Sequence, residues 1–216
     1  INIGHIHAET WKPIDISSVR LNGERFIKPI QFRAYQIDPN KFKQLWVQAP
    51  ILDVANSRSQ FKVISIPSPD GALMEFAVFQ NGVLPVQLKQ KYPSLSTYSG
   101  QGITDPNSFA VFDFTEQGFH AMVLSPNGTY FIDPVTLSDP DYYLAYYKKD
   151  FITDKRFECL TETLRPVTDA QQQCSPGQSL SRSVGTQLKT YRLAMAATGE
   201  YSAFHGGTVA GALSAI

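Results

Sequence analysis

The sequence has little cysteine, no excess charge of either sign and no long apolar run. Its 216 residues include two cysteines, and 19 basic residues balance 19 acidic ones. Because no basic stripe is available to neutralise phosphates, we expect no nucleic-acid partner. A membrane-spanning helix needs roughly 18 to 20 continuous apolar residues, and even Val83 to Leu88 is interrupted by Pro85 and Gln87. We therefore expect a soluble chain with no membrane partner.

Motifs that carry catalysis are missing as well. Inspection finds no serine-nucleophile motif, no phosphate-binding loop and no paired metal-ligand cysteines. The four histidines are His5, His7, His120 and His205, and none is followed by Glu, so the zinc-binding pattern H-E-x-x-H does not occur. We expect no catalytic residue, no metal ligand and no cofactor in this chain.

What the sequence does contain is typical of a folded, β-rich protein. Hydrophobic residues make up 43% of the chain, with 14 Phe and 10 Tyr, and disordered segments have few aromatics. Alternating residues and turn signals delimit the elements of the first half. The expected elements there are strands at 32–37, 61–66 and 73–79 and short helices at 41–47 and 84–92.

The centre of the chain predicts an antiparallel meander. Three β-prone runs, at 109–114, 119–124 and 129–132, are separated by turn residues, and Asn127-Gly128 is a strong hairpin signal. The aromatic run from Tyr142 to Tyr147 fits either a fourth strand or a short helix. The fold class we expect is mainly β (α+β): an antiparallel sheet or sandwich with short helices.

Composition divides the chain into three parts. Residues 161–187 are rich in Gln, Ser, Thr, Pro and Gly, which is typical of a linker. We therefore expect a β-rich domain at 1–160, a linker at 161–187 and a tail at 188–216, with a strand at 188–197 and a helix at 207–216. Such a tail cannot bury its apolar faces alone, so it packs on the body, belongs to a further domain or associates with a second copy.

The tail from Thr190 to Ile216, TYRLAMAATGEYSAFHGGTVAGALSAI, resembles the start of the catalytic domain of bacterial reprolysin-like zinc metalloproteases, which are secreted metzincins. The body resembles their pro-region through a set of short motifs. These are Pro67-Ser-Pro-Asp-Gly71, Thr97-Tyr-Ser-Gly-Gln-Gly102, Asp105-Pro106, Gly118-Phe-His120 and Tyr130-Phe-Ile-Asp-Pro134.

The resemblance implies a secreted zymogen, a pro-region that assists folding of a downstream protease domain and keeps it latent, and zinc in that domain. The chain starts at Ile1 without a leader, which fits removal of a signal peptide and equally a trimmed chain. Here the zinc-binding helix of the family is absent, so the chain itself is not expected to be an enzyme, while its parent is expected to be a zinc metalloendopeptidase.

Cys159 and Cys174 leave two alternatives open: one disulfide, or two free thiols. In an exported protein a disulfide closing this loop would contribute about 3 kcal/mol. Latency of a zinc protease also requires a ligand for the metal, and a thiolate suits zinc. Cys174 is therefore a candidate inhibitory ligand, although its neighbours Gln-Gln-Gln-Cys-Ser-Pro-Gly lack those of the usual cysteine switch.

The histidines have plainer interpretations. His5 and His7 would share one side of a strand, but two ligands make a weak metal site, so we expect surface histidines. We expect His120 to be a half-buried histidine within a strand and His205 to lie in a turn before a helix. The competing function for the whole chain is a secreted, β-rich binding module for glycans or surfaces.

Overall fold

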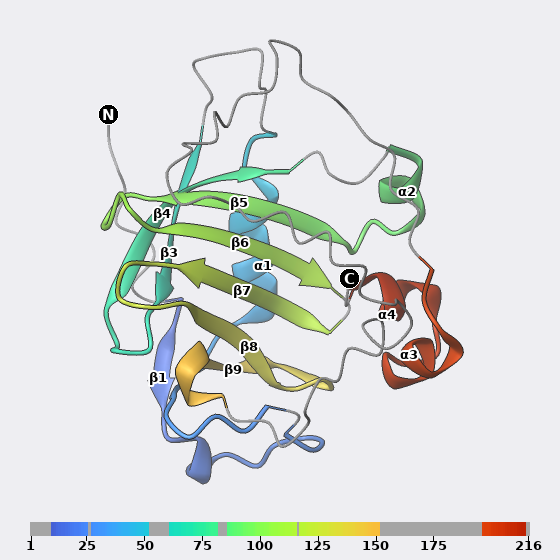
Figure 1. Ribbon diagram of the computed structural model, residues 1–216, viewed down its shortest axis with the longest axis horizontal. Helices are drawn as coiled ribbons and strands as arrows, with labels where there is room; N and C mark the ends of the chain where they lie inside the picture. Colours follow the sequence, from blue (N-terminus) through green and yellow to red (C-terminus); the bar gives the residue numbers. More distant parts are fainter. Residues whose placement is uncertain are drawn as a thin grey trace, which may run out of the picture. The chain divides into compact units, whose positions relative to one another are not determined.

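Nine antiparallel strands form one curled sheet in the computed structural model, which describes residues 10–25, 27–51, 61–81, 86–115, 117–151 and 196–214. The strands are β1 (Lys12–Ile14), β2 (Arg33–Gln36), β3 (Lys62–Pro67), β4 (Leu73–Gln80), β5 (Ser96–Gly102), β6 (Phe109–Thr115), β7 (Gly118–Leu124), β8 (Tyr130–Thr136) and β9 (Asp139–Tyr147). Their order is β1-β2-β9-β8-β7-β6-β5-β4-β3 (Figure 1). The expected mainly β fold is confirmed, with a single sheet among the described residues.

The predicted hairpins are present. β3 pairs with β4 across the Pro69-Asp70-Gly71 turn, where Gly71 adopts a φ of 92° that only glycine accepts easily. β6, β7 and β8 form the expected meander, and β9 extends it. The aromatic run from Tyr142 to Tyr147 is therefore a strand and not a helix.

Helix α1 (Pro39–Val47) covers one face of the sheet (Figure 1). Asp38 caps it by accepting hydrogen bonds from the backbone N–H groups of Asn40 and Lys41, both at 3.1 Å. One turn apart, Phe42 and Trp46 point into the aromatic core, where the Trp46 ring lies 4.8 Å from Phe112 and 5.0 Å from Phe119. We call the sheet face that packs on α1 the core face and the opposite one the outer face.

The outer face is covered by a second, smaller core at one end of the sheet. Ala34, Val135, Leu144 and Tyr146 are buried there together with Ile27 from the segment before β2. That segment is held down where Thr136 and Ser138 donate hydrogen bonds to the carbonyl oxygen of Asn22, at 2.9 and 2.6 Å.

Strand β5 was not predicted, because its sequence Ser-Thr-Tyr-Ser-Gly-Gln-Gly has few β-formers. Its glycines are required by close packing. A Cβ at Gly100 would lie 3.0 Å from the Phe112 ring and 3.1 Å from Phe76. The short strand β1 was not predicted either.

The remaining helices are short. α2 (Val86–Lys91) falls within the helix expected at 84–92. In the tail, α4 (Val209–Ser214) falls within the helix expected at 207–216, whereas α3 (Gly199–Phe204) was not predicted. The linker expected at 161–187 lies outside the described residues. The strand expected at 188–197 lies outside them too, except for residues 196 and 197. Within the described ranges, no helix is long and apolar enough to cross a membrane.

Candidate functional site

A row of polar side chains crosses the outer face of the sheet from β5 to β8. Thr97 pairs with Asp113, and Asp113 pairs with His120, in the registers of β5 with β6 and β6 with β7. His120 in turn contacts Asp133 of β8. Since side chains alternate between the two faces of a strand, these four residues share the face opposite to Phe112, Phe114 and Phe119. We call Thr97, Asp113, His120 and Asp133 the polar row.

Asp133 is the best-bonded member of the row. One of its carboxylate oxygens lies 2.8 Å from Nδ1 of His120, and the other accepts a 2.7 Å hydrogen bond from the phenol of Tyr146. Its side chain is 13% exposed and that of His120 is 23% exposed. The bond to Asp133 favours the proton on Nδ1 of the imidazole, which fixes the orientation of the ring.

Asp113 and Thr97 are bonded far less well. Oδ1 of Asp113 and Oγ1 of Thr97 are both buried, and neither has a hydrogen-bond partner. A buried acceptor without a donor costs free energy, and for a carboxyl group the cost falls on the charged form. His120 therefore has a satisfied carboxylate on one neighbouring strand and an incompletely satisfied one on the other.

Electrostatics follow from this geometry. Burial raises the pKa of Asp113 to about 6, with Asp133 adding to the rise and His120 opposing it. Burial alone would lower the pKa of His120, but the hydrogen bond to Asp133 and the charges of Asp113 and Asp133 raise it above its ordinary value. Asp113 and His120 thus both bind protons more tightly in the folded protein than in the unfolded chain.

The row is suited to holding protons near neutral pH. A nucleophile activated in the manner of a catalytic triad would need a hydroxyl or thiol hydrogen-bonded to the imidazole, and among the described residues none is bonded to His120. In the same part of the chain, no group of three or more His, Cys, Asp or Glu side chains has the arrangement of a metal site.

The structure assigns places to only some of the residues singled out in the sequence. His120 lies in β7 and is half-buried, as expected. His205 follows α3, and its ring packs 4.5 Å from that of Tyr201, so the expected turn before a helix is present. Cys159, Cys174, His5 and His7 lie outside the described residues.

Sequence reasoning missed Asp113, Asp133 and Thr97 as companions of His120. A signal was available, because the two-residue connection at 116–117 sets the register that pairs Asp113 with His120. Asp133 and Thr97 could not be added in this way, since β5 was not recognised and the β7–β8 connection is longer.

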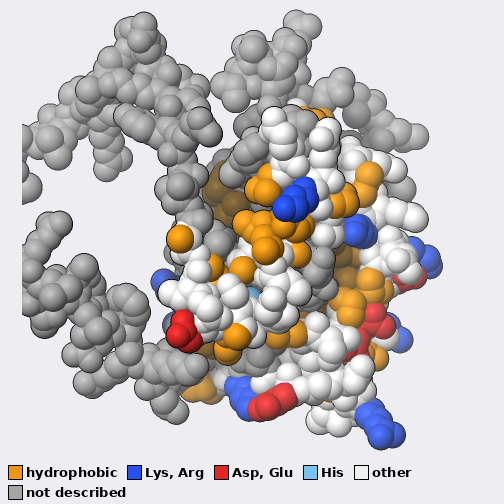
Figure 2. Space-filling model, turned by 90° about the vertical axis from the view of Figure 1, so that its right-hand side faces the viewer, with side chains coloured by type: hydrophobic (Ala, Val, Ile, Leu, Met, Phe, Trp, Pro, Cys, Tyr) orange, Lys and Arg blue, Asp and Glu red, His pale blue; other side chains and the backbone are white. Residues whose placement is uncertain are grey.

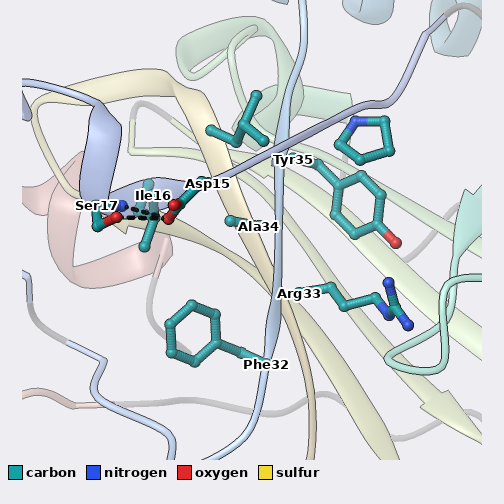
Figure 3. Close-up of a pocket in the computed structure, with 9 residues that line it drawn as sticks. Asp15, Ile16, Ser17, Phe32, Arg33, Ala34 and Tyr35 are labelled. Atoms are coloured by element: carbon teal, nitrogen blue, oxygen red, sulfur yellow. Dashed lines mark hydrogen bonds between the residues drawn. The ribbon is translucent and has the colours of Figure 1, made fainter.

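A shallow groove of about 510 Å³ beside β1 and β2 also contains charged groups. Figure 3 shows that the carboxylate of Asp15 faces Ser17, while Arg33 points away from it. Asp15 accepts hydrogen bonds from the N–H and the hydroxyl of Ser17, at 2.9 and 2.7 Å, which lower its pKa. Because its charged groups do not converge, this groove offers less chemistry than the polar row.

Comparisons with known proteins identify no relative: no protein-family model, no curated protein and no solved structure matches the chain. The family expected from the sequence motifs therefore stays a prediction.

Proposed function

We propose that this chain is the pro-region of a secreted zinc metalloprotease, joined to the first elements of the catalytic domain. In this role the β-rich body assists folding of the downstream protease and keeps it latent. The observation that carries the proposal is the contrast between a body with its own core and a tail whose sequence, from Thr190 to Ile216, resembles the start of a catalytic domain.

The core of the body supports the proposal because a folding assistant has to be folded before its client. Twenty-one buried residues from eight strands, α1 and their flanks form one cluster around Trp46 and Phe119. The tail differs in kind. Its helices α3 and α4 have six residues each and contact each other; Phe204 and Val209 are 76% and 65% exposed, and Ala212 is buried. Two such helices do not form a domain core of their own.

Exposed apolar surface supports a role in binding another protein. Figure 2 shows hydrophobic side chains gathered on the surface between polar and charged ones. On the outer face, Phe109, Met122 and Leu124 are 39%, 37% and 44% exposed, and contiguous apolar surface is a feature of interaction sites. In the proposed function this kind of surface contacts the catalytic domain, which would hold the zinc.

The same residues favour the second candidate, a secreted binding module for glycans or surfaces. A half-exposed Phe109 beside polar strand residues is the kind of platform on which sugar rings stack. The tail distinguishes the two candidates, because a glycan-binding module has no use for the start of a catalytic domain.

The first test is the gene itself. The proposal requires an H-E-x-x-H motif with a third histidine in the same reading frame after residue 216, and a reading frame that ends without one would overturn it. The second test adds the full chain to the separately produced protease domain and measures hydrolysis of a fluorogenic peptide. We expect inhibition at micromolar concentration.

Two variants sharpen the second test. Trp46→Ala, which removes the centre of the core, provides a destabilised control that should inhibit less than the wild-type chain. Cys174→Ala tests the thiolate separately: a large loss of potency supports Cys174 as the zinc ligand, whereas full potency removes that mechanism and leaves the pro-region proposal intact. Absence of inhibition by the folded wild-type chain would remove the inhibitor role.

A further inference from the structure

A cavity of about 260 Å³ opens at one end of the core face. None of the residues that line it belongs to the polar row. In an antiparallel meander alternate turns share one end of the sheet, so the β3–β4, β5–β6 and β7–β8 turns meet there (Figure 1). Asp70 comes from the first of these turns and Asp105 from the second. The fold thus brings two carboxylates from distant parts of the sequence to one opening.

A buried phenol without a partner lies in the same cavity. Tyr130 is 3% exposed, lines the cavity, and its hydroxyl makes no hydrogen bond. Tyr143, another buried tyrosine of the core face, has a bonded hydroxyl that accepts from the N–H of Phe119. Buried polar groups are usually satisfied, and of the five buried side-chain atoms without a partner in the described residues only the Tyr130 hydroxyl belongs to a residue that lines this cavity. We take it as the group that a ligand completes.

The charges of the cavity favour a cation. Asp70 accepts a hydrogen bond from Tyr147, and Asp105 accepts one from the N–H of Asn107 at 3.0 Å. Nζ of Lys149 lies 5.1 Å from the centre of the Tyr147 ring, but neither carboxylate forms an ion pair with a described basic residue. Arg33 lies beside the β3–β4 turn but donates to the carbonyl oxygen of Pro69. Burial raises the pKa of Tyr130, and nearby Tyr147 and Asp70 raise it further, so its phenol stays protonated.

The walls favour an organic cation over a metal ion. The same cavity is lined by Met74, Val123 and the edge-on pair of Tyr130 and Tyr147, whose ring centres are 6.1 Å apart. A basic side chain has an apolar stem that packs on such walls and a charged head that interacts with carboxylates and aromatic rings. The volume also greatly exceeds that of a single ion.

We propose that this cavity, which we call the Tyr130 pocket, binds the basic side chain of an arginine or lysine. The apolar stem packs on the wall that includes Met74 and Val123, and the charged head donates hydrogen bonds to the carboxylates of Asp70 and Asp105 and to the hydroxyl oxygen of Tyr130. This assignment does not depend on the proposed function.

The test is a titration of the full chain with N-acetyl-arginine amide, followed by NMR of the backbone amides. The matched probe is N-acetyl-citrulline amide, in which a neutral urea replaces the guanidinium. We expect the amides of residues 70–72 and 126–128 to shift with arginine and at least tenfold weaker binding of citrulline. Equal binding of the two probes, or shifts elsewhere only, would overturn the proposal.

Variants locate the site. Asp70→Asn lies on an exposed turn and should weaken arginine binding at least tenfold, and Tyr130→Phe should weaken it about threefold, whereas Glu24→Gln removes an equal charge elsewhere and should leave binding unchanged. Unaltered affinity in Asp70→Asn contradicts the proposal. Ethylguanidinium bound as tightly as the arginine probe indicates that a free small cation suffices, while weaker binding indicates a residue within a peptide. A calcium response without an arginine response would replace the proposal with a metal site.

Discussion

The two faces of the curled sheet bury their side chains in different ways. On the core face the buried groups are mostly rings and branched aliphatic chains, with Trp46, Phe76 and Phe119 fully buried. On the outer face, two carboxyl groups, an imidazole and a threonine hydroxyl lie half-buried in one row. The core face is therefore stabilised by apolar burial and dispersion, which pH does not change, whereas the outer face is stabilised to a degree set by protonation.

The comparison predicts which face makes the stability of the domain depend on pH. Variants of the core face should lower stability equally at every pH. Variants of the polar row should act in opposite directions, depending on whether the carboxylate removed is satisfied or not. Urea unfolding at several pH values separates these effects.

Trp46→Ala should have the largest effect. Its indole contacts the rings of Phe42, Tyr98, Phe112, Phe114 and Phe119, so truncation leaves a cavity in the centre of the core. We expect a loss of about 4 kcal/mol in the free energy of unfolding, measured by urea titration and equal at pH 5.5 and pH 8. Val47→Ala, next in α1 and 71% exposed, should change stability by less than about 0.5 kcal/mol. Similar losses in both variants would contradict the packing described for α1.

Asp133→Asn should have the next largest effect, a loss of about 3 kcal/mol, because two donors lose a charged acceptor in a part-buried site. The raised pKa of His120 adds stability that is fully present below the unfolded pKa and is lost as pH rises through the folded pKa. The loss in Asp133→Asn should therefore be greater at pH 5.5 than at pH 8. Glu24→Gln, at an exposed ion pair, serves as the control. An equal loss at pH 5.5 and pH 8 would mean that Asp133 does not raise the pKa of His120.

Much of the fold could be predicted from the sequence, since local signals were strong where side chains determine the strand. Runs such as Phe109 to Phe114 alternate clearly, and Asn127-Gly128 determines a hairpin. β5 could not be predicted, because glycine disfavours strands and the need for Gly100 arises only from its close packing on Phe76 of β4 and Phe112 of β6. β1, three residues long, exists through its pairing with β2.

The candidate site was less accessible to sequence reasoning. His120 was recognised as a half-buried strand residue, but its partners depend on registers across four strands. In the sequence, Asp113 has the position of an ordinary polar residue on the exposed face of a strand. Its burial depends on residues of the neighbouring strands, which the sequence does not place beside it. The Tyr130 pocket depends on three turns meeting at one end, which follows from topology and not from any local motif.

Asp113→Asn should act in the opposite direction to Asp133→Asn. With the pKa of Asp113 raised to about 6, the folded protein holds this proton more tightly than the unfolded chain does, so wild-type stability falls as pH rises from about 4 to 6. The amide cannot ionise, and the variant should be more stable than wild type by on the order of 2 kcal/mol at pH 7.5, with almost no difference at pH 4. Destabilisation at pH 7.5 would show that the charged form has a partner.

The smallest effects should come from two tyrosines of the core face that differ in one hydrogen bond. Tyr143→Phe leaves the buried N–H of Phe119 without its acceptor, which lies at 3.2 Å, and should cost about 1 kcal/mol. Tyr130→Phe removes a hydroxyl that has no partner and should leave the free energy of unfolding unchanged or slightly raised. Thermal unfolding of both variants without ligand checks this. A loss in Tyr130→Phe equal to that in Tyr143→Phe would mean that the Tyr130 hydroxyl is bonded within the protein, and the pocket would then lack its unsatisfied group. A loss in Tyr143→Phe alone would mean that the Tyr130 hydroxyl makes no bond within the protein, as the pocket requires.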